Sequence, residues 1–158
     1  MNKYYTKLIF ILSVFLLTSC SYKPIFSEKN YNFEINKVDY IGERQINNII
    51  KNKLNLIKKS ESLEKKEYNL TINSSKEKII VSKDSKGDPL KFEIIISTEY
   101  IVESNNSLLL SKKIKRNNIY NNSTDKFKLE QNEKIIIENL TEKIGEVIIS
   151  SIINLDDN

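Results

Sequence analysis

The residue best placed to do chemistry is the only cysteine of the chain, Cys20, which follows an apolar stretch. Lys3 and Lys7 precede that stretch, residues 8–17 form it with a single serine among them, and two small polar residues separate it from the cysteine. This order is typical of a secretory signal peptide. The apolar core is shorter than the roughly 20 residues that a membrane-spanning helix needs. The sequence therefore predicts a signal peptide over residues 1–19, and a retained membrane anchor is the weaker interpretation.

The four residues that end at Cys20, spelled LTSC, resemble the bacterial lipobox. In a lipobox the thiol is lipidated, the peptide is cut just before the cysteine, and the new amino terminus is acylated. Each buried methylene group stabilises membrane insertion by about 0.8 kcal/mol, so several acyl chains together anchor a protein firmly. The resemblance implies a Gram-negative lipoprotein, and Ser21, where inner-membrane retention usually has aspartate, implies the outer membrane. The alternative is an ordinary secreted protein whose cleavage site is followed by a cysteine.

A second set of reactive side chains is carboxylic. Glu93, Glu99 and Glu103 fall on one expected strand, and two of them could act as an acid and base pair. The simpler interpretation is that they form the solvated face of that strand. The chain has no histidine, and lipidation uses its one cysteine, so the usual general base and the soft metal ligands are missing. The sequence predicts no enzyme, no metal site and no cofactor other than the acyl lipid on Cys20.

Basic side chains gather at one place late in the chain. The densest cluster consists of Lys112, Lys113, Lys115 and Arg116. A guanidinium fork and mobile ammonium groups suit phosphate oxygens, so this cluster is a candidate anion site. Alternatively, alternating lysines here protect an edge strand against unwanted pairing. Lys83 and Lys86 are a weaker candidate, since residues of a turn are often charged without binding anything.

The overall charge gives no sign of nucleic-acid binding. Removal of Lys3 and Lys7 with the signal peptide lowers the formal charge from +4 to +2. The mature chain is long enough for one domain with a sizeable core. We expect an extended lipidated leader at 20–30, a single domain at 31–153 and a frayed tail at 154–158.

Hydrophobic periodicity indicates the elements of this domain. Apolar residues alternate with polar ones in the expected strands and recur at helical spacing in the expected helices. The predicted strands are 31–40, with a bulge near Asn36 and Lys37, 68–81, with a break at Ser74 and Ser75, 90–103 and 108–120. The predicted helices are 42–59 and 126–153, and residues 117–125 are expected to be a polar loop.

This order predicts an α+β fold. Each helix has one apolar face, and so has the clearest strand, 90–103, so both helices are expected on one face of a four-stranded, mainly antiparallel sheet. The result is a two-layer sandwich with the order strand, helix, three strands, helix. A doubly wound parallel sheet is disfavoured because the turns after residues 81 and 102 are too short for crossover helices.

At this point the chain resembles the LPS-assembly lipoprotein family, LptE. The resemblance extends as a pattern over the whole mature chain, and it includes an early strand and a Gly87 hairpin that leads into long amphipathic strands. The matching residues are Cys20, Tyr22, Pro24 and Phe26 in the leader, Arg44, Gln45, Ile46, Asn47, Asn48, Ile50 and Leu54 in the first helix, and Tyr120 and Glu130 near the last helix.

The resemblance implies a lipoprotein that plugs a large outer-membrane β-barrel, supports its assembly and contacts lipopolysaccharide. Lipid A phosphates would be the counterions of residues 112–116, and segments 117–125 and 83–89 would line the polar lumen of the barrel. The alternative is an accessory lipoprotein of another envelope lipid or solute transport complex. A structural lipoprotein that binds peptidoglycan is a third possibility, but the chain carries no wall-binding motif.

Overall fold

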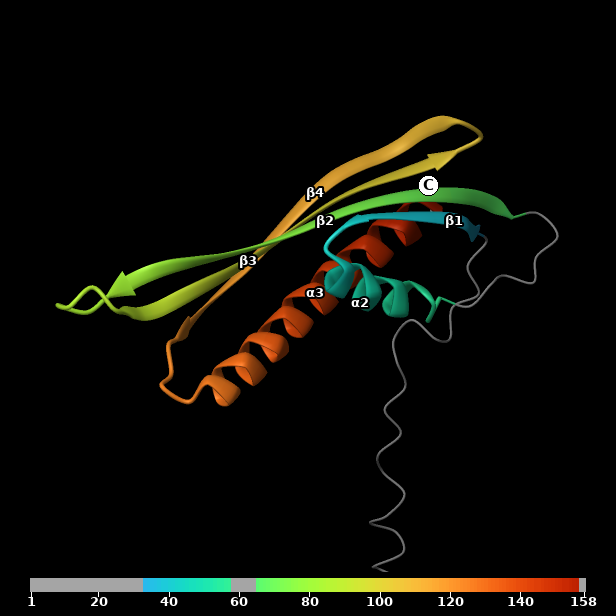
Figure 1. Cartoon of the computed structure of the whole chain (residues 1–158). Coiled ribbons are helices and arrows are strands. Elements are labelled where there is room, and N and C mark those ends of the chain that lie inside the picture. Colours follow the sequence, from blue (N-terminus) through green and yellow to red (C-terminus); the bar gives the residue numbers. More distant parts are fainter. Residues whose placement is uncertain (1–32, 58–64, 157–158) are drawn as a thin grey trace, which may run out of the picture.

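Four strands and two helices form the part of the chain that the computed structural model describes, residues 33–57 and 65–156 (Figure 1). The elements, in chain order, are β1 (Phe33–Gly42), α2 (Arg44–Leu54), β2 (Lys66–Lys83), β3 (Pro89–Ser104), β4 (Ser107–Asn121) and α3 (Lys126–Asp156). The predicted order of elements and the α+β class are confirmed. The signal peptide, Cys20, the leader at 20–30 and the end of the predicted tail lie outside the described residues.

The sheet has the order β1-β2-β3-β4, which makes β1 and β4 its edge strands among the described residues. β2 pairs with β3, and β3 with β4, in antiparallel orientation, as the short turns predicted, while β1 runs parallel to β2 and is joined to it across α2. The predicted bulge is present, because the β1–β2 register shifts between Ile35 and Lys37. The sheet is therefore mixed, with its parallel pair at one edge.

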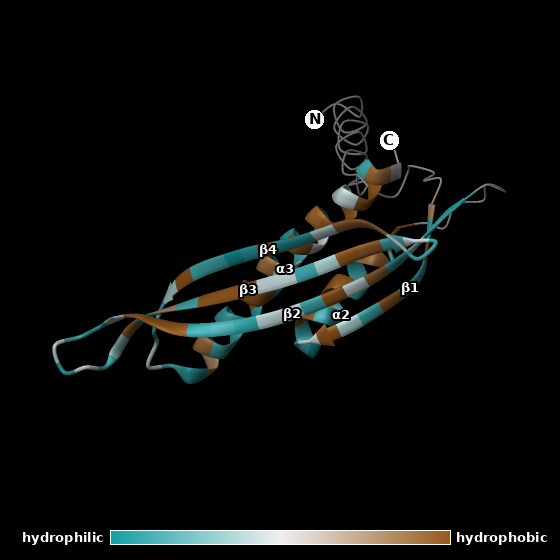
Figure 2. Cartoon of the chain, turned by 90° about the horizontal axis from the view of Figure 1, so that it is seen from above, coloured by the Kyte–Doolittle hydropathy of each residue, from teal (hydrophilic) through white to brown (hydrophobic). Residues whose placement is uncertain are grey.

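Both helices lie on the same face of the sheet (Figure 1). Apolar and polar residues alternate along the strands, visible as bands of brown and teal on β1 and β3 (Figure 2). On β3 the side chains that face the helices are buried, including Ile96, Tyr100 and Val102. They meet the apolar stripes of the helices, for example Ile50 of α2 and Ile144 of α3. Burial of these side chains stabilises the two layers by about 1.5–3 kcal/mol for each large one.

The corner between β1 and α2 is held by a small polar network. Gly42 adopts φ 89°, which a residue with a side chain rarely adopts, and the next backbone N–H, that of Glu43, donates to the Ser74 carbonyl at 3.1 Å. The Ser74 hydroxyl donates to Asn47 Oδ1 at 2.7 Å, and Asn47 Nδ2 donates to the Ile41 carbonyl at 3.1 Å. These bonds fix α2 against the middle of β2.

Three predicted boundaries are wrong in detail. The predicted break at Ser74 and Ser75 does not occur, because Ser74 is buried and hydrogen-bonded and β2 stays paired with β3 through it. The first helix ends at Leu54 and a turn follows to Ile57. α3 continues through Asp156, three residues beyond its predicted end. Within the described part of the chain, no helix is both long enough and apolar enough to span a membrane.

The hairpin of β2 and β3 projects beyond β1 and both helices (Figure 1). β2 has 18 residues and β3 has 16, whereas β1 has 10, so the far ends of the two central strands extend past the layer that the helices cover. β4 accompanies β3 as far as Lys91, so the projecting part has three strands at Ile79 and Ile80 and two strands only at its tip.

Candidate functional site

The projecting hairpin carries a group of exposed apolar side chains, which we call the hairpin patch. Its members and their exposed fractions are Ile79 (37%), Ile80 (47%), Val81 (45%) and Leu90 (50%). Their exposure follows from the fold, because strand alternation sends side chains to both faces of a ribbon that has no helix beneath it. Grouped exposed apolar residues of this kind mark interaction sites more often than single ones do. Sequence reasoning missed this patch, since the same alternation looked like an ordinary half-buried strand.

The tip of the hairpin is a well-formed turn. Asp84 Oδ1 accepts hydrogen bonds from the backbone N–H groups of Lys86 and Asp88 at 2.9 and 2.8 Å, and Gly87 adopts φ 90°. This is the short turn that was predicted after residue 81, at the Gly87 hairpin. Lys83 and Lys86, the weaker candidates, are exposed on it beside the hairpin patch.

The base of the hairpin is braced against α3. Lys78 of β2 forms an ion pair with Glu133 of α3, and its Nζ also lies 4.4 Å from the centre of the Phe92 ring. The Tyr120 hydroxyl donates to Glu133 Oε1 at 2.7 Å. These contacts join β2, β3 and β4 to the first half of α3 where the helix layer begins. The hairpin therefore has a fixed direction relative to the body.

The same brace shifts two pKa values. Burial alone raises the pKa of Glu133, but hydrogen bonds from Lys78 and Tyr120 and the charges of Lys78 and Lys76 outweigh it and lower the pKa below its ordinary value. The pKa of Tyr120 is raised by burial and by its bond to the Glu133 carboxylate. Glu133 is thus held ionised, and Tyr120 is held as a hydrogen-bond donor.

The predicted basic cluster lies on β4 and divides between the two faces of that strand. Lys112 and Arg116 pair with Tyr100 and Ile96, which face the helices, whereas Lys113 and Lys115 pair with Glu99 and Ser97 on the uncovered face. All four side chains are exposed. The structure therefore brings them together as two pairs, not as one patch of four cations. β4 is an edge strand, so charges on both of its faces also fit the alternative role of edge protection.

The pair on the helix side has a neighbour that the sequence did not reveal. Arg116 and Lys143 of α3 line one groove of about 340 Å³, together with Glu146, Ser150 and Ser151. The two cations are 27 residues apart in the chain and line the same groove only because α3 lies along β4. No local pattern could have joined them.

The predicted polar loop at 117–125 is mostly strand, which corrects the prediction. β4 continues to Asn121, and Asn117 donates to Glu93 of β3 while its backbone pairs with Ile95. The remaining residues, 122–125, hold the entrance of α3, where Asp125 Oδ1 accepts from the Lys128 N–H at 3.1 Å. Asparagine has low strand propensity, so this paired stretch read as a loop.

The carboxylates Glu93, Glu99 and Glu103 lie on the uncovered face of β3, as the strand pattern predicted. Glu99 is opposite Lys113, and Glu103 is opposite Asn69. Within residues 33–57 and 65–156 no group of acidic residues has the arrangement of a metal site. The three carboxylates follow one strand face and do not converge on a cavity.

The fold matches solved structures of bacterial lipoproteins. Rare lipoprotein B from Shewanella oneidensis matches with a TM-score of 0.55 at 14% identity, over 74% of this chain and 93% of that one. Lipoprotein B from Nitrosomonas europaea matches with a TM-score of 0.60 at 15% identity, over 85% and 91%. A minor lipoprotein from Acinetobacter baumannii matches with a TM-score of 0.51 at 14% identity, over 75% and 94%. No protein-family model and no curated protein matches the sequence.

At such low sequence identity, the structural similarity shows a shared fold and nothing more. The matches cover more than nine-tenths of each lipoprotein, so the whole architecture is shared and not one supersecondary motif. The chain therefore has the fold of rare lipoprotein B, an LptE-like fold, as its resemblance to the LPS-assembly lipoprotein family predicted.

Proposed function

We propose that this chain is an outer-membrane lipoprotein, anchored through acyl groups on Cys20, that plugs and helps to assemble the barrel that inserts lipopolysaccharide. The observation that carries the proposal is the shared fold with rare lipoprotein B, combined with the lipobox at Cys20. In this role the protein is not an enzyme and needs no cofactor beyond its lipid.

The hairpin patch supports the proposal because it gives the domain a way to grip a larger partner. The narrow end of the sheet, with exposed apolar side chains near its tip, can be enclosed by a partner, whereas the half-covered body offers only one face. The brace at Lys78 and Glu133 holds the ribbon in one direction, so little conformational entropy is lost on docking. A lipid anchor in the same membrane raises the effective concentration of the two proteins.

Lipopolysaccharide contact is assigned to the basic residues of β4. Of the two pairs, Lys112 and Arg116 are the better candidates for lipid A phosphates, since Lys143 joins Arg116 in the groove along α3. A guanidinium and an ammonium group together can bind one phosphate by a fork and a point charge. Lys83 and Lys86 at the hairpin tip are the second candidates.

Copurification from a gently solubilised envelope tests the proposal. We expect a chain tagged after Asn158 to recover a large outer-membrane barrel at about one-to-one stoichiometry, identified by mass spectrometry. The double variant Ile80→Asp and Leu90→Asp is expected to lose the barrel, because two charges replace half of the hairpin patch. Leu56→Asp, at a residue 59% exposed and remote from the hairpin, is the matched control and should retain it.

Other outcomes would contradict the proposal. Recovery of an inner-membrane transporter would favour an accessory subunit of another envelope transport complex. Lipopolysaccharide contact is tested separately with the purified complex, by comparing Lys112→Ser with Arg116→Ser against Lys113→Ser with Lys115→Ser. We expect weaker binding of lipopolysaccharide in the first double variant only. Equal losses in both double variants would show that lipopolysaccharide responds to the total positive charge of β4 and not to a specific site.

A further inference from the structure

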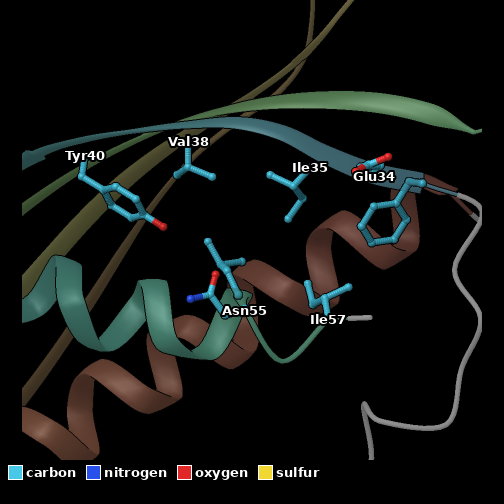
Figure 3. Close-up of a pocket in the computed structure, with 8 residues that line it drawn as sticks. Glu34, Ile35, Val38, Tyr40, Asn55 and Ile57 are labelled. Atoms are coloured by element: carbon cyan, nitrogen blue, oxygen red, sulfur yellow. The ribbon is translucent and has the colours of Figure 1, made fainter. Parts of the chain in front are cut away.

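An apolar groove lies at the β1 edge of the domain, away from the hairpin patch (Figure 3). Its volume is about 220 Å³, and side chains of Ile35, Val38 and Tyr40 hang from β1 toward the end of α2, where Leu54 and Ile57 line the opposite side. The three β1 side chains face the core yet are only half-buried. They are core residues that the described part of the chain leaves partly uncovered.

The groove is open because α2 is short. α2 has 11 residues and ends at Leu54, whereas α3 has 31 and covers the central strands. Among the described residues β1 has a strand neighbour on one side only, which is β2. The groove therefore opens outward at the edge of the sheet, where an additional segment could lie against it.

The segment that joins the domain at this place is the leader. Phe33, the first described residue, is part of the groove wall, and residues 20–32 are attached to it. This leader carries Tyr22, Pro24, Ile25 and Phe26, followed by the polar residues 27–30. We propose that Ile25 and Phe26 of the leader dock in the groove between β1 and α2.

The length of the leader fits this occupant. Phe26 and Phe33 are seven residue steps apart, and at about 3.3 Å per step an extended chain reaches about 23 Å, the distance that β1 covers from Phe33 to Tyr40. A turn within residues 27–30 uses part of this reach, so a leader that turns back there would place Ile25 and Phe26 at the Phe33 end of the groove, near Ile57. An apolar cavity of about 150 Å³ accommodates a benzene ring, so the groove has room for the Phe26 ring and part of a branched side chain.

Docking of the leader would change how the domain is held at the membrane. The thirteen residue steps from Cys20 to Phe33 reach about 43 Å when extended, but only the six steps from Cys20 to Phe26 remain free after docking, with a reach of about 20 Å. The domain would then stay close to the anchor, with the hairpin directed away from the β1 edge. The docking itself does not depend on the proposed barrel or on lipopolysaccharide.

Disulfide capture in the full chain tests the docking directly. Phe26→Cys is combined with Ile57→Cys on the groove wall, and mild oxidation is followed by peptide mapping, so that Cys20 cannot be mistaken for either thiol. The matched control combines Phe26→Cys with Ile119→Cys, an exposed residue on β4. We expect the groove pair to form its disulfide at least about tenfold faster than the control, since docking raises the local concentration of the two thiols. Equal rates would overturn the proposal.

Hydrogen exchange distinguishes the leader from other occupants. Ile25→Ser with Phe26→Ser should speed exchange in residues 35–41 and 54–57 by at least about threefold, whereas Ser27→Ala with Asn30→Ala should not. Unchanged exchange in the first variant would contradict docking. If protection of the groove residues disappeared on dilution, a second copy of the chain would occupy the groove. If it disappeared in Cys20→Ser but not in the double variant Ile25→Ser with Phe26→Ser, an acyl chain would occupy it. Each of these results overturns the proposal.

Discussion

The body around the β1–α2 corner and the projecting hairpin are built from the same sheet but are stabilised in different ways. At the corner, Asn47 and Ser74 are buried and bonded to each other and to the backbone. In the hairpin, apolar side chains are exposed, and order comes from the turn at Asp84 and the brace at Glu133. The corner therefore buries its polar groups and satisfies them internally, whereas the hairpin leaves apolar side chains that the described part of the chain does not cover.

Two glycines make this difference measurable, because they share one backbone conformation. Gly42 has φ 89° and Gly87 has φ 90°. A Cβ atom on Gly42 would lie 1.9 Å from the Ser74 carbonyl oxygen, whereas a Cβ atom on Gly87 would meet nothing within 4 Å. The same substitution thus adds only backbone strain in the hairpin, but backbone strain and a collision at the corner.

We expect Gly42→Ala to have the largest effect of all. The free energy of unfolding should fall by about 4 kcal/mol or more, because β2 must move away from the corner and break the bond from Glu43 to Ser74. Gly87→Ala should cost only about 1 kcal/mol, the usual cost of a left-handed conformation. Urea denaturation of the two variants measures both values. Similar losses would contradict the distinction between the two regions.

Asn47→Ala comes next. It removes the side-chain donor to the part-buried Ile41 carbonyl, and it removes the buried Asn47 Oδ1, which leaves the Ser74 hydroxyl only its longer bond of 3.3 Å to the Glu43 carbonyl. The loss should be about 2 kcal/mol, the cost of buried polar groups that lose their partners. Thermal and urea unfolding check it, and the exposed neighbour Asn48→Ala serves as the control on the same helix.

The hydroxyl of Tyr100 is also buried but, unlike that of Ser74, it makes no hydrogen bond among the described residues. The whole Tyr100 side chain is fully buried. Tyr100→Phe should therefore raise the free energy of unfolding by about 1 kcal/mol. If Asn47→Ala and Tyr100→Phe changed stability in the same direction, hydrogen bonding would not be what separates these two sites.

The body was largely predictable from the sequence, and the reasons are local. Alternation on residues 90–103 and helical spacing on residues 126–153 both reflect one buried face, which one-dimensional patterns record directly. The turn at Asn105 and Asn106 was also predictable, since both adopt positive φ and asparagine tolerates it. Fold class, order of elements and the antiparallel arrangement of the last three strands followed from such signals.

The interaction surfaces were less predictable, because they depend on where other elements end. Ile80 and Leu90 follow the same alternation as buried residues and yet are about half-exposed, on the hairpin that projects beyond both helices (Figure 1). Arg116 and Lys143 line one groove through the placement of α3, and no spacing in the chain encodes that arrangement. The four basic residues of β4 were adjacent in sequence, yet strand alternation divides them between two faces.

The brace at the base of the hairpin should respond to pH. Because the pKa of Glu133 is lower in the folded chain than its ordinary value of 4.5, its ionised form stabilises the folded state above that pH. The contribution is lost as the pH falls through the lower, folded pKa. Glu133→Gln should therefore cost about 1 kcal/mol at pH 7 and progressively less below pH 4.5, where wild type loses the same contribution.

Unfolding curves at pH 7 and at about pH 3 measure this convergence. Glu130→Gln, at an exposed residue one turn earlier in α3, is the control and should show a much smaller gap at pH 7. A constant gap between wild type and Glu133→Gln at both pH values would mean that the charge of Glu133 does not hold the hairpin.

The smallest expected effect is the most informative about function. Ile80→Asp with Leu90→Asp should change the free energy of unfolding by less than about 0.5 kcal/mol for each residue, because both side chains are about half-exposed and lie beyond the core. The same variant is expected to lose the barrel in copurification. Loss of the partner without loss of stability would show that these apolar residues serve binding, whereas a large loss of stability would mean that the hairpin patch packs within the domain and leaves the partner's contact surface to be sought elsewhere.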